Sequence, residues 1–432
     1  MKKKATKPTR ALTRRAALGS LAAGSAALAF PLYLPSRLFG ENAPSKQITL
    51  GFIGVGLHGL GHNLNQTLQQ PDAKVLAVCD VYASRAEKAQ RYVKSRDKSE
   101  DCKTYSDFRE VLARKDIDAV VISTPDHWHV PLSLAAARAG KDVFCEKPTL
   151  TIAEGRELVN VMKQHDVVYQ AGLEDRATDE YHRMAQIVRN GGIGTLQSID
   201  VYLPEGTLYK KEEPAPVPAD LNWNLWLGPA PFAPYSPRRT EPQAWRNIRD
   251  YSGGKLTDWG AHLLDTALVA NFAQHTGPVE VSGKGEVPAN AMNSVPSNYD
   301  ISYRFANGVT LRVRSGKVAI RFEGSAGWVG NQGWRTRLEA SSPEILKMQW
   351  PSDKDRLWAR PPLEHRNFLD CVKSRKATTY PPEDIHRLST TMHLANIAME
   401  LGRKLTWDPK TEAFKDNDAA NVLRSRESRQ WA

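Results

Sequence analysis

Residues 48–59, with the sequence ITLGFIGVGLHG, decide the fold of this chain. The segment ITLGFI predicts a buried strand, and the apolar spacing that follows predicts a helix. Between them, Gly54 permits a tight turn, Gly56 lets the backbone approach a pyrophosphate, and Gly59 lets the helix pack against the strand. The stretch predicts a dinucleotide site, although glycine turns after strands are common. The turn residues expected to bind the cofactor are Gly54, Gly56, Leu57, His58 and Gly59.

A carboxylate, Asp80, ends the next predicted strand, 21 residues beyond Gly59. At this position a carboxylate accepts hydrogen bonds from an adenosine ribose and repels a 2′-phosphate. Asp80 therefore favours NAD over NADP. The alternative is a structural turn followed by a surface aspartate, and the register of strand, turn, helix and acid argues against it.

Short apolar runs and helical periods alternate from residue 48 onward. This alternation predicts an α/β fold in which residues 45–171 form a Rossmann domain with a doubly wound parallel sheet. The expected strands are ITLGFI, KVLAVCD, DAVVIST, DVFCE and residues 167–171, and the expected helices lie near 59–70, 83–95, 130–139 and 151–165.

The alternation ends near residue 172, where a second, sheet-rich domain is expected to begin and to extend to residue 409. Residues 410–432 read as a loosely held polar tail. The other expected elements are a helix ending at Gly191-Gly192, strands at 196–203 and within 278–340, an extended aromatic-rich loop at 204–245, and a helix at 382–402.

Most of the formal net charge of +11 belongs to the first 40 residues, which hold eight lysines and arginines and no acid. The pair Arg14-Arg15 and the small-residue apolar run after it are typical of a twin-arginine signal. We therefore expect residues 1–44 to engage the twin-arginine translocation machinery, leaving the protein in the periplasm or anchored facing it. A basic tail with a short anchor is the alternative. Basic runs interleaved with aromatics are missing, so no nucleic-acid partner is expected.

Three separated segments carry the residues on which chemistry would depend: TPDHWH at 124–129, CEKP at 145–148 and SGGKLTDWGAH at 252–262. The first two follow predicted parallel strands, beyond whose carboxyl ends ligands bind. We therefore expect Thr124 and Lys147 at the cofactor crevice. In the third segment, Asp258, His262 and Asp265 are spaced to share one face of a helix.

In combination these motifs resemble the Gfo/Idh/MocA oxidoreductases, over residues 46–407. The resemblance implies that the second domain is an α+β domain with an open, mostly antiparallel sheet, which supports the substrate site and commonly a homo-oligomer. It also implies a catalytic set of Lys147, Asp258 and His262. The motifs that carry it are GVGLHG, Asp80, TPDHWH, Glu146-Lys147-Pro148, Trp245-Arg246 and the helix from Asp258 to His262.

Oxidation of a secondary alcohol needs a base for the hydroxyl proton, a positive group for the developing alkoxide, and a hydride acceptor. His262 is the expected base, because the unperturbed pKa of histidine lies near neutrality. Lys147 is expected to orient the hydroxyl and stabilise the alkoxide. Asp258 is expected to bind substrate hydroxyls and to hold Lys147 or His262.

Further site residues are assigned around this set. His58 and His62 are spaced like a metal pair, but no carboxylate or cysteine accompanies them in the sequence, so no metal is expected. For Trp128 and the other tryptophans, core packing is the alternative. The remaining cofactor-binding residues are Thr124, Pro125, Trp128, His129, Glu146 and Lys147; the substrate-binding residues are Arg176, Trp245, Arg246, Asp258 and His262.

The leading hypothesis is NAD-dependent, reversible oxidation of a carbohydrate hydroxyl, with C3 of a pyranoside as one candidate position. The first alternative is a redox glycosidase, in which transient oxidation permits elimination of the aglycone. The second is a non-enzymatic, NAD-bound sensor, which would not need Lys147 and His262. Because free NAD is scarce outside the cytoplasm, export further implies that the cofactor is tightly retained.

Overall fold

The computed structural model describes residues 47–97 and 100–431, which belong to one compact unit. The expected export segment, residues 1–44, lies outside the described residues. Within the part of the chain that is described, no helix has the length and apolar character needed to cross a membrane.

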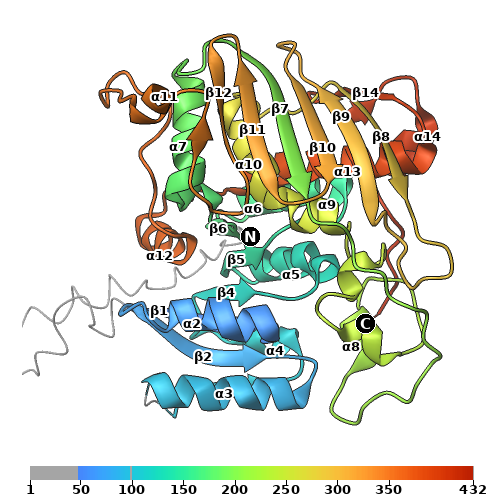
Figure 1. Cartoon of the computed structure of the whole chain (residues 1–432). Helices are drawn as coiled ribbons and strands as arrows, with labels where there is room; N and C mark the ends of the chain where they lie inside the picture. The colour runs from blue at the N-terminus through green and yellow to red at the C-terminus, as the bar shows by residue number, and fades with distance from the viewer. Residues whose placement is uncertain (1–46, 98–99, 432) are drawn as a thin grey trace, which may run out of the picture. The chain divides into compact units, whose positions relative to one another are not determined.

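The first sheet has six parallel strands in the order β3-β2-β1-β4-β5-β6, which confirms the doubly wound Rossmann fold. Its central strands are apolar and buried on both faces, as a sheet covered by helices requires. The strands are β1 (Ile48–Ile53), β2 (Ala73–Cys79), β3 (Lys103–Tyr105), β4 (Ala119–Ile122), β5 (Asp142–Glu146) and β6 (Tyr169–Gly172) (Figure 1).

The strand order reverses between β1 and β4, so a crevice is expected at the carboxyl ends of these two strands. The helix after β4 begins at Asp126 rather than near residue 130, which places TPDHWH at its N-terminus. β3 and α4 were not predicted, because they are short. The helices of this part are η3 (Gly59–Leu64), α2 (Asn65–Thr67), α3 (Ala83–Asp97), α4 (Phe108–Ala113), α5 (Asp126–Arg138) and α6 (Ile152–Gln164).

Among the described residues the second sheet has nine strands, and in it only β7 and β10 pair in parallel. In β9 buried and exposed residues alternate, so one face of the sheet packs on the core and the other is open. An open, mostly antiparallel sheet is thus confirmed. In sheet order the strands are β13 (Glu339–Ala340), β12 (Gly327–Asn331), β11 (Ala319–Gly324), β7 (Leu196–Leu203), β10 (Thr310–Ser315), β9 (Asn298–Arg304), β8 (Glu280–Glu286), β14 (Leu405–Asp408) and β15 (Ala413–Phe414).

Helices join the two sheets. α10 packs on α7 and β7, while α13 packs on β8 and on α6 of the Rossmann part, so a single hydrophobic core extends from one sheet to the other (Figure 1). The helices are η4 (Asp175–Ala177), α7 (Asp179–Arg189), α8 (Trp223–Leu227), η5 (Pro237–Thr240), η6 (Trp245–Asn247), α9 (Lys255–Asp258), α10 (Gly260–Ala270), α11 (Pro343–Lys347), α12 (Glu364–Ser374), α13 (Pro382–Leu401) and α14 (Asp418–Val422).

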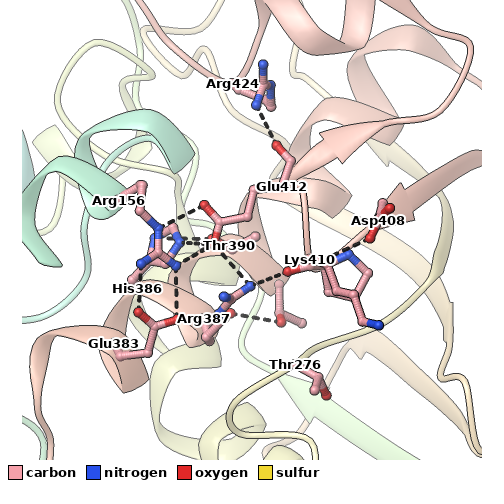
Figure 2. Close-up of polar contacts among 12 residues, drawn as sticks. Arg156, Thr276, Glu383, His386, Arg387, Thr390, Asp408, Lys410, Glu412 and Arg424 are labelled. Atoms are coloured by element: carbon pink, nitrogen blue, oxygen red, sulfur yellow. Dashed lines mark hydrogen bonds and ion pairs between the residues drawn. The ribbon is translucent and has the colours of Figure 1, made fainter. Parts of the chain in front are cut away.

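The prediction of a loosely held tail at 410–432 is wrong for the residues that the structure describes. Glu412 accepts hydrogen bonds from Arg156 of α6 and is bonded to His386 of α13 (Figure 2). Farther along, Trp431 packs edge-on against Trp128, with ring centroids 4.7 Å apart. A polar composition suggested mobility, but Glu412 is paired with residues of α6 and α13, and the Trp431 ring is packed.

Candidate functional site

The glycine turn has the geometry that its sequence requires. Gly54 has a φ of +84°, which favours glycine. A Cβ atom on Gly59 would lie 2.2 Å from the carbonyl oxygen of Gly54, so only glycine fits there. The turn is held from below by Asp80, whose Oδ2 accepts a hydrogen bond of 2.9 Å from the backbone N–H of Val55. The carboxylate that was predicted to face the ribose therefore also fixes the turn.

A cavity of about 470 Å³ opens beyond this turn and extends to α9 and α10. Most of the predicted site residues line it, and two do not: Gly59 lies beneath the turn, and Arg176 lies elsewhere. The predicted residues that line the cavity are Gly54, Gly56, Leu57, His58, Asp80, Thr124, Pro125, Trp128, His129, Glu146, Lys147, Trp245, Arg246, Asp258 and His262.

Trp128 and His129 form a rigid part of the cavity wall. The indole N–H of Trp128 donates to the carbonyl oxygens of Leu225 and Trp226. The two ring nitrogens of His129 lie 2.8 Å from the carbonyl oxygen of Pro148 and 2.9 Å from that of Thr124. His129 thus links the loops that follow β4 and β5, and Trp128 links α5 to α8.

Glu146 lies at the junction of the glycine turn and β5. Its Oε1 accepts a hydrogen bond of 2.9 Å from Asn63 and lies 3.0 Å from Nε2 of His58. Burial by itself would raise the pKa of Glu146, but His58, Asn63 and Lys147 outweigh burial and lower it to about 2. In return, the Glu146 carboxylate raises the pKa of His58.

Lys147 and Asp258 form a buried ion pair across the cavity floor. Nζ of Lys147 donates to Oδ1 of Asp258 at 3.0 Å and to its backbone carbonyl at 2.9 Å. Burial opposes the charge on Lys147, yet the carboxylates of Asp258 and Glu146 raise its pKa above the usual value. Lys147 is therefore a fixed positive charge, suited to stabilising an alkoxide.

Two more cations surround Asp258. Nε of Arg246 lies 3.4 Å from Oδ1, and Nζ of Lys255 lies 3.7 Å from Oδ2. Burial would raise the pKa of Asp258, but Lys147, Arg246 and Lys255 hold it well below its usual range. Arg246 also stacks on Trp245, with Cζ of its guanidinium 4.3 Å from the centroid of the indole ring. This side of the cavity is both positive and aromatic.

His262 is oriented by a carboxylate that the sequence argument did not assign. Nδ1 of His262 lies 2.8 Å from Oδ2 of Asp175, a fully buried residue. Burial lowers the pKa of His262, but Asp175 outweighs burial, so the net shift is upward. Because Nδ1 donates to Asp175, Nε2 carries the lone pair. The indole of Trp334, 5.3 Å from the imidazole, packs beside it.

The assignment of Arg176 to substrate binding is wrong. Its guanidinium, 6% exposed, donates twice to Asp265 at 3.0 and 2.7 Å and once to Asp384 at 2.6 Å. Asp265, three residues after His262 in α10, faces Arg176, whereas Asp258 and His262 line the cavity. Arg176 holds η4, α10 and α13 together.

Several residues of the site were missed. Asp175, which bonds to His262 from behind the cavity wall, lies in the segment GLEDR at 172–176, whose adjacent acids were the available signal. Trp334 and Glu364 come from segments that carry no recognisable motif, so their positions depend on the tertiary fold. The other missed residues that line the cavity include Glu174, Gln243 and Arg85.

The described residues fit a bound NAD. The turn leaves no room for a side chain at Gly59, which permits close packing beneath the phosphates. Oγ1 of Thr124 is buried at the cavity without a hydrogen-bond partner among the described residues, so it is free to bond to a ligand. The turn would hold the pyrophosphate, Asp80 the adenosine ribose, and Thr124 and Glu146 the nicotinamide end.

The fold and this site together define a nicotinamide-dinucleotide-binding protein of the oxidoreductase type. Two family models match the chain: an oxidoreductase family NAD-binding Rossmann fold at residues 48–173, and the C-terminal α/β domain of the same family at residues 205–432. The chain belongs to the Gfo/Idh/MocA oxidoreductase family.

Individual relatives are more distant. Inositol 2-dehydrogenase of Salmonella paratyphi B is 30% identical over 147 residues, which are 33% of this chain and 42% of that protein. A glycosyl hydrolase family 109 protein of a Shewanella species is 30% identical over 132 residues, 29% of this chain and 28% of that protein. The chain thus matches less than half the length of these relatives. The WlbA dehydrogenase from Bordetella pertussis, solved with NADH and UDP-GlcNAcA, shares the fold with a TM-score of 0.63 at 15% identity, over 83% of this chain and 98% of that one.

Replacing Arg176 with methionine should destabilise the protein by about 3–5 kcal/mol, because two buried carboxylates lose their partner. Urea denaturation of the purified variant measures this loss. Arg138→Met, which removes an exposed ion pair with Glu157, is the control and should change little. A variant of Arg176 as stable as the parent protein would contradict the structural role.

Replacing Asp175 with asparagine should lower the pKa of His262, because the carboxylate that raises it is lost while burial remains. If His262 must be deprotonated to act, the acidic limb of the kcat/KM profile shifts to lower pH in this variant. The pH dependence of kcat/KM for both proteins measures the shift. An unmoved limb would show that Asp175 does not control the reacting base.

Proposed function

We propose that the protein is an NAD-dependent oxidoreductase that oxidises or reduces a secondary hydroxyl or ketone of a carbohydrate or polyol. One observation carries this proposal. A charged Lys147 and an Asp175-bound His262 line the same cavity as the dinucleotide turn. A sensor would need the turn but not this pair of groups, so the enzymatic proposal is favoured over a non-enzymatic role.

The residues divide the chemistry between them. Bound NAD supplies the acceptor for the hydride that leaves the carbinol carbon. The hydroxyl proton passes to Nε2 of His262, whose Nδ1–H remains bonded to Asp175. The Lys147 ammonium donates a hydrogen bond to the same oxygen and stabilises its developing negative charge. The organic product is a ketone, and the reverse sequence reduces it.

The surroundings of the site support a polyhydroxylated substrate. Arg246 and Gln243 offer hydrogen-bond donors on one side, where Lys255 donates to Gln243 and orients it, while Trp245 and Trp259 offer flat apolar surface. This combination suits hydroxyl recognition together with packing against a sugar ring. The name of the matched inositol 2-dehydrogenase supports the same substrate class. We keep C3 of a pyranoside as the candidate reaction position, and a homo-oligomer as the expected assembly.

A redox glycosidase is the second candidate, and the match to glycosyl hydrolase family 109 favours it. In this reaction the first oxidation would make the neighbouring C–H acidic, so that its proton is lost as the aglycone leaves. Water would then add across the resulting double bond, and the hydride would return to the sugar ketone. The cofactor is therefore regenerated in each turnover. The same Lys147 and His262 serve both candidates, so the site geometry fits either one.

The decisive assay follows absorbance by reduced nicotinamide in a panel of free sugars, polyols and aryl glycosides. A dehydrogenase accumulates NADH in proportion to oxidised sugar, whereas a glycosidase releases the aglycone without net NADH. His262→Ala should lose on the order of 10²-fold or more in rate yet retain cofactor. Turnover of this variant at the parental rate would remove His262 from the mechanism, and no turnover of any panel member by the parent protein would oppose the proposal.

We also propose that the protein is exported through the twin-arginine translocation machinery with its cofactor already bound. The Arg14-Arg15 pair and the apolar run after it support this. Replacing both arginines with lysine should retain the precursor in the cytoplasm, and cell fractionation measures this. Mass spectrometry of the exported protein should find a bound nicotinamide dinucleotide. Normal export of the variant, or exported protein without nucleotide, would contradict the respective part of the proposal.

A further inference from the structure

Three residues from distant parts of the chain meet beside the cavity: His62 of η3 and Glu364 at the start of α12, which both line it, and His365, the next residue of α12. One ligand atom of each lies within 4.8 Å of those of the other two. The sequence argument against a metal was that no carboxylate accompanies the histidine pair. The structure overturns that premise, because Glu364 lies 302 positions from His62 and 3.5 Å from it in space.

The tautomer of His365 follows from its neighbours. Nδ2 of Asn63 donates to the Glu146 carboxylate at 2.9 Å, which fixes the orientation of the amide. Oδ1 of Asn63 therefore faces Nε2 of His365, 3.0 Å away, and accepts a hydrogen bond from it. In the neutral imidazole, Nδ1 is then left with a lone pair directed toward Glu364. A metal-binding histidine commonly has this second hydrogen bond from its other nitrogen.

The spacing between the ligand atoms fits a metal better than a hydrogen bond. Oε1 of Glu364 lies 3.3 Å from Nδ1 of His365 and 3.5 Å from Nε2 of His62. Charge-assisted hydrogen bonds are shorter, about 2.7–2.9 Å. Two ligands at tetrahedral positions, each about 2.0–2.1 Å from a zinc ion, lie roughly 3.3–3.4 Å apart. The two distances from Oε1 of Glu364 are close to this separation between zinc ligands.

Glu364 adds an independent observation. The residue is only 6% exposed, and its Oε2 has no hydrogen-bond partner among the described residues. An unpaired buried carboxylate oxygen is costly unless a ligand satisfies it.

We propose that His62, Glu364 and His365 bind one Zn²⁺ ion. Two imidazoles and one carboxylate are a set that zinc uses where a fourth position stays open to water or substrate. Here the fourth position faces the cavity, since His62 and Glu364 both line it. α12 lies outside every motif used to assign the site. Through Glu364 and His365 it supplies two of the three ligands of this ion, beside the glycine turn. The ligand set shares no residue with the groups assigned to the redox reaction, so the metal proposal does not depend on that function.

The test uses the full-length protein with its cofactor bound. After dialysis against a chelator, isothermal titration with ZnCl₂ should show one Zn²⁺ per chain. Co²⁺ in its place should give the visible absorption bands of a tetrahedral site. Glu364→Gln and His62→Ala should each weaken Zn²⁺ binding at least about 10-fold. His165→Ala, which removes an exposed histidine outside the cluster, is the control and should leave binding unchanged.

Near-UV circular dichroism and nucleotide content show whether each variant is folded. The His62 side chain is more exposed than that of Glu364, so His62→Ala tests the site without disturbing the core. A protein that binds no Zn²⁺, or binds it equally in the parent and both variants, would overturn the proposal. His365 would then carry a proton on Nδ1 and pair with Glu364 as an ordinary ion pair. Because the readouts are metal stoichiometry and spectra, failure here would leave the redox assay unaffected.

Discussion

The ion pair between Lys147 and Asp258 is the contact on which the cavity depends. Lys147 follows β5 of the parallel sheet, and Asp258 ends α9 beneath the antiparallel sheet, so two hydrogen bonds of Lys147, to the carboxylate and to the backbone carbonyl of Asp258, join the two halves of the site. Both side chains are largely excluded from water, and a charge in such surroundings is tolerated only when it is paired. Separating the two elements would take from each charge its nearest partner. The requirement for pairing therefore fixes the position of α9 relative to the cofactor crevice.

The same constraint gives different properties to Lys147 and His262, the two groups to which we assign the proposed reaction. Carboxylates beside Lys147 keep it protonated, so it can serve only as a positive hydrogen-bond donor. One carboxylate behind His262 sets its tautomer and raises its basicity, and leaves the other nitrogen available to a substrate proton. The carboxylate partners thus make Lys147 a fixed charge and His262 a group that can exchange a proton. The Glu146–His58 pair extends the arrangement to the turn beneath the cofactor phosphates.

Local sequence predicted the parts of the fold that depend on local chemistry. The glycine turn, Asp80 and the strand-helix alternation of the first sheet could be read directly, because backbone sterics and periodicity determine them. The family resemblance supplied the open second sheet and the Lys147, Asp258 and His262 set. Long-range pairing could not be read. Arg176 looked like a substrate ligand because nothing in its own segment reveals Asp384, and the polar composition after residue 410 concealed Glu412 and Trp431 as packed residues.

The central claim is that one cavity brings a sugar carbon and the nicotinamide ring together for direct hydride transfer. A sugar that the protein accepts, deuterated at the reacting carbon, tests this most directly, with mass spectrometry of the nucleotide bound to the protein after a single turnover. The account predicts that the deuterium appears in the reduced nicotinamide ring, at one deuterium per sugar oxidised or, for a glycosidase, transiently before it returns to the same carbon. Deuterium lost to water while the sugar is oxidised or cleaved would contradict hydride transfer in this site.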